Sequence, residues 1–416
     1  MAQNEREVVF MDYLAEKFSK LSTDNAPGQE EFQKFENLPM IGGEIEGAAV
    51  DFSHGDVNAH QPIPGTLETF IKHYCVDGTY QAYTEYRGKG AVREYLAEKL
   101  SEYSGAPVNP QTEIILTPGT QGALFLAMGS LIGRGDKVAI VEPDYFDNRK
   151  LVEFFEGEII PIPMHWKEAM PHTSGIDLKE LEEAFKNGAK LFLYSNPNNP
   201  TGAVFSKEEV VEIARLAKTY DVAVLADELY SRQILEKDIT YTHMRALPEK
   251  PEKLITIMGP SKTESLSGFR LGVGYGTPEI INRMEKLQAV VSLRCAGYNQ
   301  AAFYRWFSEP DGWLEKRIDD HRQIRDDILA VINSCSGCWA RPTEGGSYIF
   351  MQLPKLKIDI FQFTKLCRVQ ANVTVTPGTE FGKQYDNFIR MNFSQDHDKA
   401  VDAVKRICKM VDRYRA

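Results

Sequence analysis

The sequence predicts an α/β protein in which helices cover both faces of a largely parallel sheet, with a smaller α+β domain attached. Two observations support this class. Between residues 110 and 275, short apolar runs alternate with amphipathic stretches, a pattern typical of strand–helix crossover units. After residue 280 the pattern changes to long helical stretches followed by a few short strands, which indicates a second domain of different construction.

The strands of the sheet are expected where short apolar runs end in polar or glycine residues. These runs cover residues 113–116, 137–141, 157–162, 190–194, 222–226 and 254–258, with a further strand at 272–275. Ligands of such folds bind outside the carboxyl ends of the strands, so the residues that follow each run are the first place to look for chemistry.

The remaining elements complete the division into domains. Helices are expected at residues 279–291 and 299–333, short strands at 346–353, 373–375 and 388–393, and a closing amphipathic helix at 398–414. We divide the chain into an N-terminal arm at residues 1–50 that joins the small domain, a large domain at 51–310, and a small C-terminal domain at 311–416.

Composition narrows the class of protein. A chain of 416 residues that is 43% hydrophobic suits an enzyme of two or three domains. The formal charge of −11 and the lack of a Lys/Arg run argue against a nucleic-acid partner. The N-terminus lacks the order of a signal peptide and no apolar run is long enough to span a bilayer, so we expect a cytoplasmic protein.

Six cysteines in so long a chain do not make a disulfide framework. Cys335 and Cys338 form a Cys-x-x-Cys pair, which could be half of a zinc site or a redox pair. No second Cys/His pair lies at suitable spacing, so this spacing favours a loop between a helix and a strand. We expect no metal site.

Lys262 is the most informative residue, because it follows a predicted strand and is followed eight residues later by Arg270. A lysine so placed can hold an aldehyde cofactor as an imine, and the arginine can neutralise a phosphate on the same ligand. That cofactor would be pyridoxal phosphate. The alternative for a Ser/Gly-rich stretch of this kind is a solvated loop.

Other strand endings carry residues that suit the same ligand. Gly119, Thr120 and Gln121 open a helix after the first strand, where free backbone N–H groups favour a phosphate, although they could simply start the helix. Tyr145 follows the second strand and could lie flat on a ring or pack in the core. Asn199 lies in a Pro/Asn-rich turn, and could donate a hydrogen bond to a phenolate oxygen.

Asp227 and Tyr230 end the next predicted strand as Asp-x-x-Tyr. A carboxylate at this edge could face a ring nitrogen and keep it protonated, with Tyr230 reaching the same oxygen as Asn199. The ordered set of Asn-Pro-Thr-Gly at 199–202, Asp-x-x-Tyr, Ser-Lys at 261–262 and Arg270 resembles the fold type I pyridoxal phosphate enzymes of the class I and II aminotransferase family. The resemblance runs from about Gly55 to the C-terminus.

The resemblance implies a role for each residue of the set. Lys262 would hold the cofactor aldehyde and transfer protons, Asp227 would pair with the pyridinium nitrogen, and Asn199 and Tyr230 would bind the ring oxygen. The phosphate would be held by Gly119, Thr120 and Arg270, with Tyr145 on the ring and Gln121 and Ser261 also in the cofactor site.

Two further residues follow from the resemblance. Tyr83 is similar to a tyrosine that family members lend to the phosphate of the neighbouring subunit, which implies a homodimer with shared active sites. Arg390 is similar to the arginine that binds the substrate carboxylate, a task suited to planar bidentate donors. An arginine that starts an amphipathic strand could otherwise be a surface residue.

Several positions depart from the family pattern. Glu264 stands where an apolar or aromatic residue is usual, so it could face a cationic substrate or point to solvent. Gly259 stands where a phosphate-binding serine is frequent. His54, next to Gly55 beside the expected substrate carboxylate, could shuttle protons or bind loop backbone.

The start of the chain around Asp12 is similar to the start of pyridoxal enzymes that modify arginine, in which an acidic residue of the arm closes over the guanidinium. An arm packed on its own dimer is the alternative. Our first hypothesis from the sequence is a cyclase that expels the hydroxyl of a hydroxylated arginine and closes the guanidine into a ring, resembling enduracididine-forming cyclases. His54 or Glu264 would assist the loss of hydroxide, and Asp12 or Glu264 would hold the guanidinium.

The second hypothesis is an aminotransferase that moves the α-amino group of an amino acid to a 2-oxo acid. A non-enzymatic regulator on the same scaffold is disfavoured, because such proteins append a DNA-binding domain and the first fifty residues are too short and acidic for one.

Overall fold

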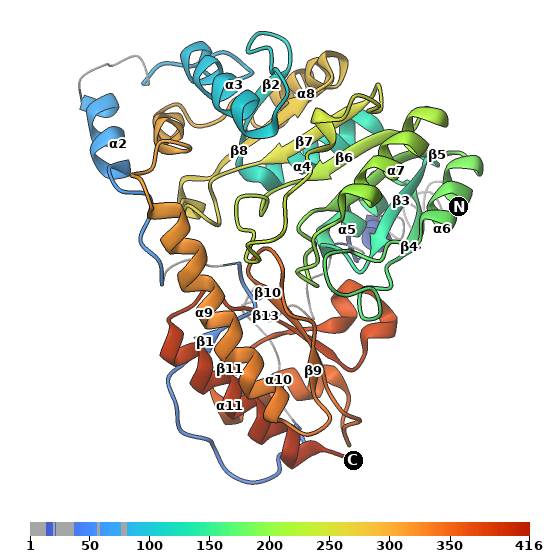
Figure 1. Cartoon of the computed structure of the whole chain (residues 1–416), viewed down its shortest axis with the longest axis vertical. Coiled ribbons are helices and arrows are strands. Elements are labelled where there is room, and N and C mark those ends of the chain that lie inside the picture. Colours follow the sequence, from blue (N-terminus) through green and yellow to red (C-terminus); the bar gives the residue numbers. More distant parts are fainter. Residues whose placement is uncertain (1–13, 20, 22–36, 56–58, 76–80) are drawn as a thin grey trace, which may run out of the picture.

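The computed structural model describes residues 14–19, 21, 37–55, 59–75 and 81–416 (Figure 1). A seven-stranded sheet in the order β2-β8-β7-β6-β5-β3-β4 forms its larger part. The strands are β2 (Ile114–Pro118), β3 (Lys137–Glu142), β4 (Glu158–Pro163), β5 (Ala189–Ser195), β6 (Ala223–Asp227), β7 (Leu254–Met258) and β8 (Leu271–Gly276). Pairing is parallel except that β8 runs antiparallel to both of its neighbours. The predicted α/β class with a largely parallel sheet is confirmed.

Helices cover both faces of this sheet, because successive side chains of each strand point to opposite sides. Val138 and Ile140 of β3 face a cluster formed with α4, α5 and α8, whereas Ala139 and Val141 face a cluster formed with α6 and α7. The helices are α3 (Gly90–Ser104), α4 (Gly119–Leu131), α5 (Phe146–Phe154), α6 (Leu178–Lys186), α7 (Lys207–Thr219) and α8 (Pro278–Val291). Helix α3 packs at the β2 and β8 edge, and α2 (Thr66–Cys75) lies against the residues after α8.

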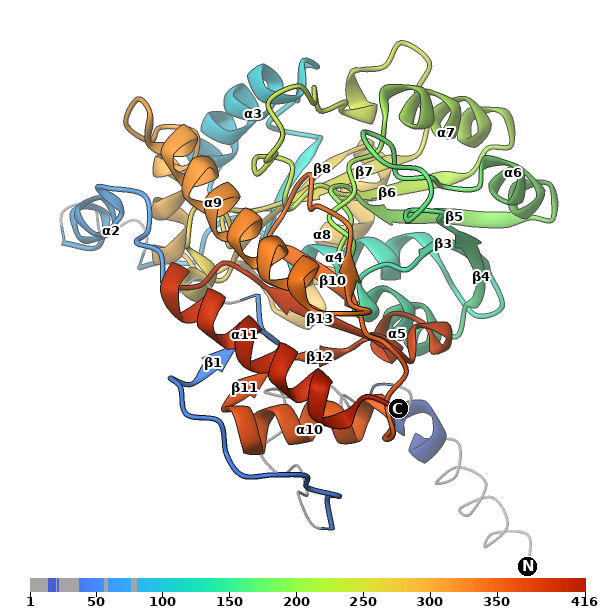
Figure 2. The same cartoon turned by 60° about the horizontal axis from the view of Figure 1, so that its bottom comes forward.

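The C-terminal part forms a separate core around a four-stranded sheet in the order β12-β13-β10-β9 (Figure 2). Its elements are α9 (Trp313–Ser334), β9 (Trp339–Ala340), β10 (Tyr348–Gln352), α10 (Ile360–Ala371), β11 (Val373–Thr374), β12 (Thr376–Pro377), β13 (Phe388–Asn392) and α11 (His397–Tyr414). Strand β1 (Val50–Asp51) pairs with β11, so the segment before the large sheet joins the smaller part. The exact domain boundaries at residues 50 and 310 stay predictions.

One predicted helix, at residues 299–333, was wrong in extent. The structure has a 3-10 segment at Tyr298–Arg305 and begins α9 only at Trp313. Pro310 and Gly312 lie between them, and Gly312 adopts a left-handed φ of 77°. A proline and a left-handed glycine both interrupt a helix, which accounts for the break.

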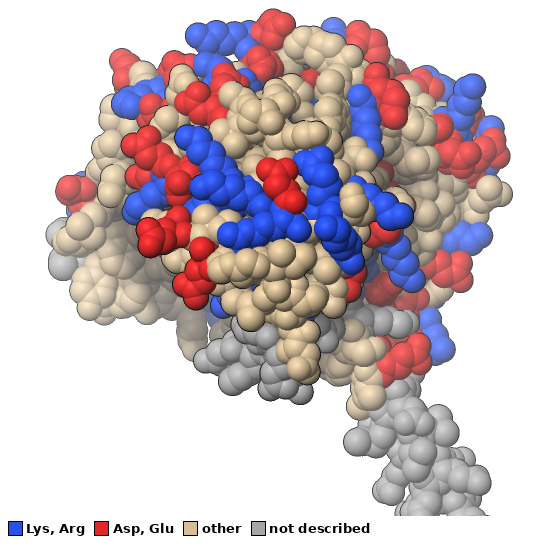
Figure 3. Space-filling model, turned by 90° about the horizontal axis from the view of Figure 1, so that it is seen from below, with Lys and Arg blue, Asp and Glu red and all other residues tan. Residues whose placement is uncertain are grey.

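The loop prediction for the Cys-x-x-Cys pair is confirmed, since Cys335 directly follows α9 and Cys338 directly precedes β9. Among the described helices, none combines the length and apolarity needed to cross a membrane. On the face shown in Figure 3, a band of Lys and Arg side chains has Asp and Glu side chains within it and around it.

Candidate active site

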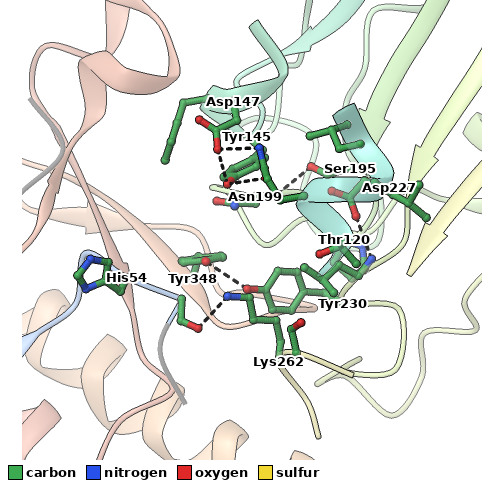
Figure 4. A pocket seen from close by; sticks show the side chains of 18 of the residues that line it. His54, Thr120, Tyr145, Asp147, Ser195, Asn199, Asp227, Tyr230, Lys262 and Tyr348 are labelled. Carbon is green, nitrogen blue, oxygen red and sulfur yellow. Dashed lines mark hydrogen bonds between the residues drawn. The ribbon is translucent and has the colours of Figure 1, made fainter. Parts of the chain in front are cut away.

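A cavity of about 290 Å³ opens at the carboxyl ends of the central strands, where the sequence led us to look. Residues of both sheets line this cavity, and Figure 4 shows the side chains that face it. The cavity is lined by twelve of the predicted site residues: His54, Gly55, Thr120, Gln121, Tyr145, Asn199, Asp227, Tyr230, Ser261, Lys262, Arg270 and Arg390.

Lys262 follows β7 in a turn and presents its amine to the middle of the cavity. The amine donates a 2.8 Å hydrogen bond to the carbonyl oxygen of Gly55. Gly55 has no room for a side chain, since a Cβ atom there would lie 2.2 Å from Lys262 Nζ. The glycine therefore leaves the amine the space in which it must act.

Asp227 is the last residue of β6 and lines the cavity. Burial raises the pKa of its carboxyl group to about 6, while a hydrogen bond from the Leu229 N–H and the charge of Lys262 act to lower it. A carboxylate held away from water gains most from a cationic partner, so this position suits a protonated ring nitrogen.

Arg390 projects from β13 and is 3% exposed. Its Nη1 donates to Asn199 Oδ1 at 3.1 Å, and its Nη2 donates to the Ser53 carbonyl oxygen at 2.8 Å. Its Nε is buried without a hydrogen-bond partner among the described residues. Because a buried donor is costly when unsatisfied, this guanidinium is suited to receive an anionic ligand.

The part of the cavity at the start of α4 has the features of a phosphate-binding site. Helix α4 starts at Gly119 without a side-chain cap, so its first N–H groups are open to a ligand. Gly119 has a φ of 77°, and Arg270 lies beside it. Ser261 Oγ is buried without a hydrogen-bond partner in the part of the chain that the structure describes.

Glycines allow this corner to be so tight. A Cβ atom on Gly272 would lie 2.2 Å from the backbone carbon of Gly119, and one on Gly259 would lie 2.8 Å from the Leu271 carbonyl oxygen. The glycine at 259, where the family frequently has serine, is thus required by the close approach of β8.

Tyr145 lies on one wall with its ring fixed at both ends. Its hydroxyl donates to Asp147 Oδ2 at 2.7 Å and lies 3.3 Å from Gln121 Oε1. Its backbone N–H donates to Asp144 Oδ1 at 2.6 Å. An aromatic ring held in this way can cover one face of a flat ligand.

The position of Glu264 differs from our prediction that it faces a cationic substrate or solvent. It is 2% exposed, it does not line the cavity, and its carboxylate receives a 2.6 Å hydrogen bond from Arg232. Arg232 also pairs with Glu309 and lies over the Phe307 ring. Glu264 therefore points neither into the cavity nor to solvent, because its carboxylate forms an ion pair with the buried Arg232.

The remaining predicted residues lie further from the centre. His54 is at the rim, apart from the cluster around Lys262 in Figure 4, and its Nδ1 lies 3.2 Å from Asp51 Oδ2. Tyr83 is outside the cavity and 81% exposed, with the Arg294 guanidinium 4.6 Å from its ring centroid. Asp12 lies outside the described residues.

Sequence reasoning missed four residues of the site. Asp144 accepts hydrogen bonds from the backbone N–H and hydroxyl of Ser195, and that hydroxyl accepts the Asn199 N–H at 3.2 Å. Tyr348 and Asp147 line the cavity as well. Tyr348 comes two residues after the glycine pair at 345–346, within a predicted strand, but this local pattern does not show that its side chain reaches the site.

Pyridoxal phosphate fits the residues present. The uncapped helix, the unpartnered Ser261 hydroxyl and Arg270 would hold its phosphate, and Asp227 would pair with its ring nitrogen. Asn199 and Tyr230 would hold its ring oxygen, with Lys262 at the aldehyde. An anion site, an acid and an amine are thus set around one cavity, as this cofactor requires.

Comparison with known proteins agrees with this fit. The family described as aminotransferase class I and II matches residues 50–407. The crystal structure of an aspartate aminotransferase from Rhodobacter sphaeroides 2.4.1 is similar, with 52% sequence identity, a TM-score of 0.91, and a match that covers 97% of this chain and 100% of that one.

Two more distant relatives are also named as aminotransferases. An aspartate aminotransferase of Sulfolobus acidocaldarius is 28% identical over 82% of this chain and 84% of its own length. An aromatic-amino-acid aminotransferase of Thermococcus litoralis is 25% identical over 82% of this chain and 87% of its own. Fold and site together define a fold type I, pyridoxal-phosphate-dependent enzyme. The chain belongs to the aminotransferase class I and II family.

Proposed function

We propose that this enzyme is an aminotransferase that takes the α-amino group from an amino acid and delivers it to a 2-oxo acid. The observation that carries the proposal is that Lys262, Arg390 and Asp227 line one cavity. An amino acid substrate needs an amine that moves the proton of its Cα, which Lys262 supplies, and a group that binds its carboxylate, which Arg390 supplies.

Each residue has a task in this reaction. Arg390 binds the substrate carboxylate and thereby fixes Cα in front of the Lys262 amine. The cofactor, when bound, supplies the electron sink that weakens the bonds at Cα. The Lys262 amine would take the proton from Cα and deliver it to the cofactor carbon that carried the aldehyde. Asp227 would hold the ring nitrogen in its protonated form.

The arginine-cyclase hypothesis has lost much of its support. It relied on Glu264, which is paired with Arg232, on His54, which lies at the rim beside Asp51, and on Asp12, which lies outside the described residues. The relatives named above are aminotransferases for aspartate or aromatic amino acids. We therefore favour transamination.

We also propose a homodimer, in which Tyr83 serves the site of the partner. The high exposure of Tyr83 supports this arrangement. Light scattering would then give twice the chain mass of 47.0 kDa. Mixing inactive Tyr83→Ala and Lys262→Ala proteins would restore activity, because mixed dimers have one intact site. A cytoplasmic location stays a prediction.

The reaction is tested with purified enzyme, 2-oxoglutarate and a panel of amino acids that begins with aspartate and the aromatic residues. We expect glutamate to form, and none with Lys262→Ala. A parallel incubation with 4-hydroxyarginine tests the cyclase, which would give a product lighter by one water without a 2-oxo acid. That product, in the absence of any glutamate, would refute the proposal.

A further inference from the structure

Tyr348 lines the cavity, and the mechanism above gives it no role. It is the first residue of β10 and is 5% exposed. In the antiparallel pairing of β10 with β13, Tyr348 lies opposite Asn392 and Phe350 lies opposite Arg390. Tyr348 and Arg390 are therefore diagonal neighbours on one face of the sheet.

The ring of Tyr348 supports the guanidinium of Arg390. The guanidinium carbon lies 4.4 Å from the ring centroid of Tyr348, closer than to the rings of Phe381 at 5.0 Å and Phe146 at 5.7 Å. A cation over an aromatic face is attracted to it, most strongly where water is excluded. The ring thus helps to fix the direction of the carboxylate anchor.

The hydroxyl of Tyr230 donates a 3.1 Å hydrogen bond to the hydroxyl of Tyr348, and the two rings meet edge to face at 78°. The same hydroxyl borders the space in front of Lys262, since a Cβ atom on Gly55 would lie 2.9 Å from it. When Tyr230 donates its proton to the ring oxygen of the cofactor, its own oxygen can accept the proton of Tyr348.

The charges around the pair agree with this direction of donation. Burial acts to raise the pKa of Tyr348, but the Arg390 guanidinium, the Lys262 amine and the hydrogen bond from Tyr230 together outweigh it and lower the pKa. Burial raises the pKa of Tyr230 well above its usual value. In the structure Tyr348 accepts the proton of Tyr230, and as the more acidic phenol it can donate in return once the Tyr230 hydroxyl turns to the cofactor. Asp227 is the other charged group that faces them.

We propose that Tyr348 is a positioning residue of this site, whose ring orients Arg390 and whose hydroxyl orients Tyr230. One side chain would then align the substrate carboxylate and the ligand of the cofactor ring oxygen. The inference rests on the proposed aminotransferase function, because it concerns the same substrate and cofactor.

Two variants separate the two roles. Tyr348→Phe keeps the ring and removes the hydroxyl, whereas Tyr348→Leu removes both. Tyr385→Phe is the matched control, because Tyr385 is a buried phenol outside the cavity. Circular dichroism and thermal melting establish that each variant is folded, and Tyr348→Phe is nearly isosteric.

The measurements are the affinity of each apoenzyme for pyridoxal phosphate, by fluorescence titration, and the KM of each holoenzyme for its best amino acid. We expect Tyr348→Phe to lose about 3- to 10-fold in cofactor affinity, the effect of one hydrogen bond, with KM within about 2-fold of wild type. Tyr348→Leu should lose the same affinity and show a KM about 10- to 30-fold higher. Tyr385→Phe should match wild type in both.

Wild-type cofactor affinity in Tyr348→Phe would overturn the role of the hydroxyl, and equal KM in the two variants would overturn the role of the ring. A wild-type enzyme that transfers no amino group would refute the proposed function instead. In that event cofactor affinity still tests the hydroxyl, and the dissociation constant of maleate, a carboxylate without an amino group, tests the ring.

Discussion

Arg390 donates a 3.1 Å hydrogen bond to Asn199 Oδ1, and this bond joins the two sheets of the molecule at the active site. Arg390 comes from β13 of the smaller sheet, while Asn199 lies in the turn after β5 of the larger one. The bond leaves Arg390 Nε for a ligand and fixes Asn199 against the ring-oxygen position. Substrate binding and cofactor binding therefore depend on one contact.

Arg390→Lys tests the carboxylate anchor. Lysine keeps the charge but lacks the planar pair of donors, and losing one charged hydrogen bond costs about 1.5 to 3 kcal/mol. We expect KM for the amino acid to rise about 10- to 100-fold, with the visible absorption of the cofactor retained. An unchanged KM would show that the carboxylate binds elsewhere.

Gly55→Ala tests the space around the Lys262 amine. A Cβ atom at 2.2 Å from Nζ and 2.9 Å from the Tyr348 hydroxyl must push these side-chain ends aside, and the three atoms nearest to it all belong to side chains rather than to the backbone. We expect kcat/KM to fall at least about 10-fold, as small displacements of reacting groups do, with the melting temperature unchanged. Gly43→Ala is the control, because a Cβ atom there meets nothing within 4 Å. Equal activity in the two variants would contradict the crowding argument.

Glu264→Gln separates a structural carboxylate from one that serves the substrate. Neutralising one partner of a buried pair leaves the charge of Arg232 less well compensated, so we expect a loss of about 3 kcal/mol in the free energy of unfolding. The kcat/KM of the folded enzyme should stay within about 2-fold. Glu249→Gln, which breaks the exposed pair with Lys218, should leave the free energy of unfolding nearly unchanged. A large fall in activity at unchanged stability would return Glu264 to the substrate site.

Asp144 should make the stability of the apoenzyme depend on pH. Burial raises the pKa of its carboxyl group to about 7, against hydrogen bonds from Ser195 and Tyr145, whereas an aspartate in an unfolded chain titrates near about 3.9. The native protein thus keeps a proton that the unfolded chain has released. The stabilisation from Asp144 is complete below about pH 4 and is lost as the pH rises through about 7.

Urea unfolding of wild-type and Asp144→Asn apoenzymes measures this effect. The free energy of unfolding of wild type, relative to the variant, should fall between about pH 4 and pH 7 and stay level above that. A difference that is constant, or that rises with pH, would mean that Asp144 is ionised throughout this range.

Much of this picture could be predicted from the sequence, because each strand of the large sheet is a short apolar run with its own local signal. The residues after those runs were predicted for the same reason, and nine of them line one cavity. Glu264 could not be placed in this way, since its partner Arg232, and the Glu309 that also pairs with this arginine, are distant in the chain. Tyr348 was missed because only the pairing of β10 with β13 brings it to Arg390.

The most direct test of the account is to find where the cofactor is attached. The purified enzyme is incubated with pyridoxal phosphate, reduced with borohydride to make the attachment permanent, digested and examined by mass spectrometry. We expect the added mass on the peptide that contains Lys262, with Lys262→Ala colourless and unlabelled. A label on another lysine, or a wild-type protein that stays colourless with the cofactor present, would contradict the account.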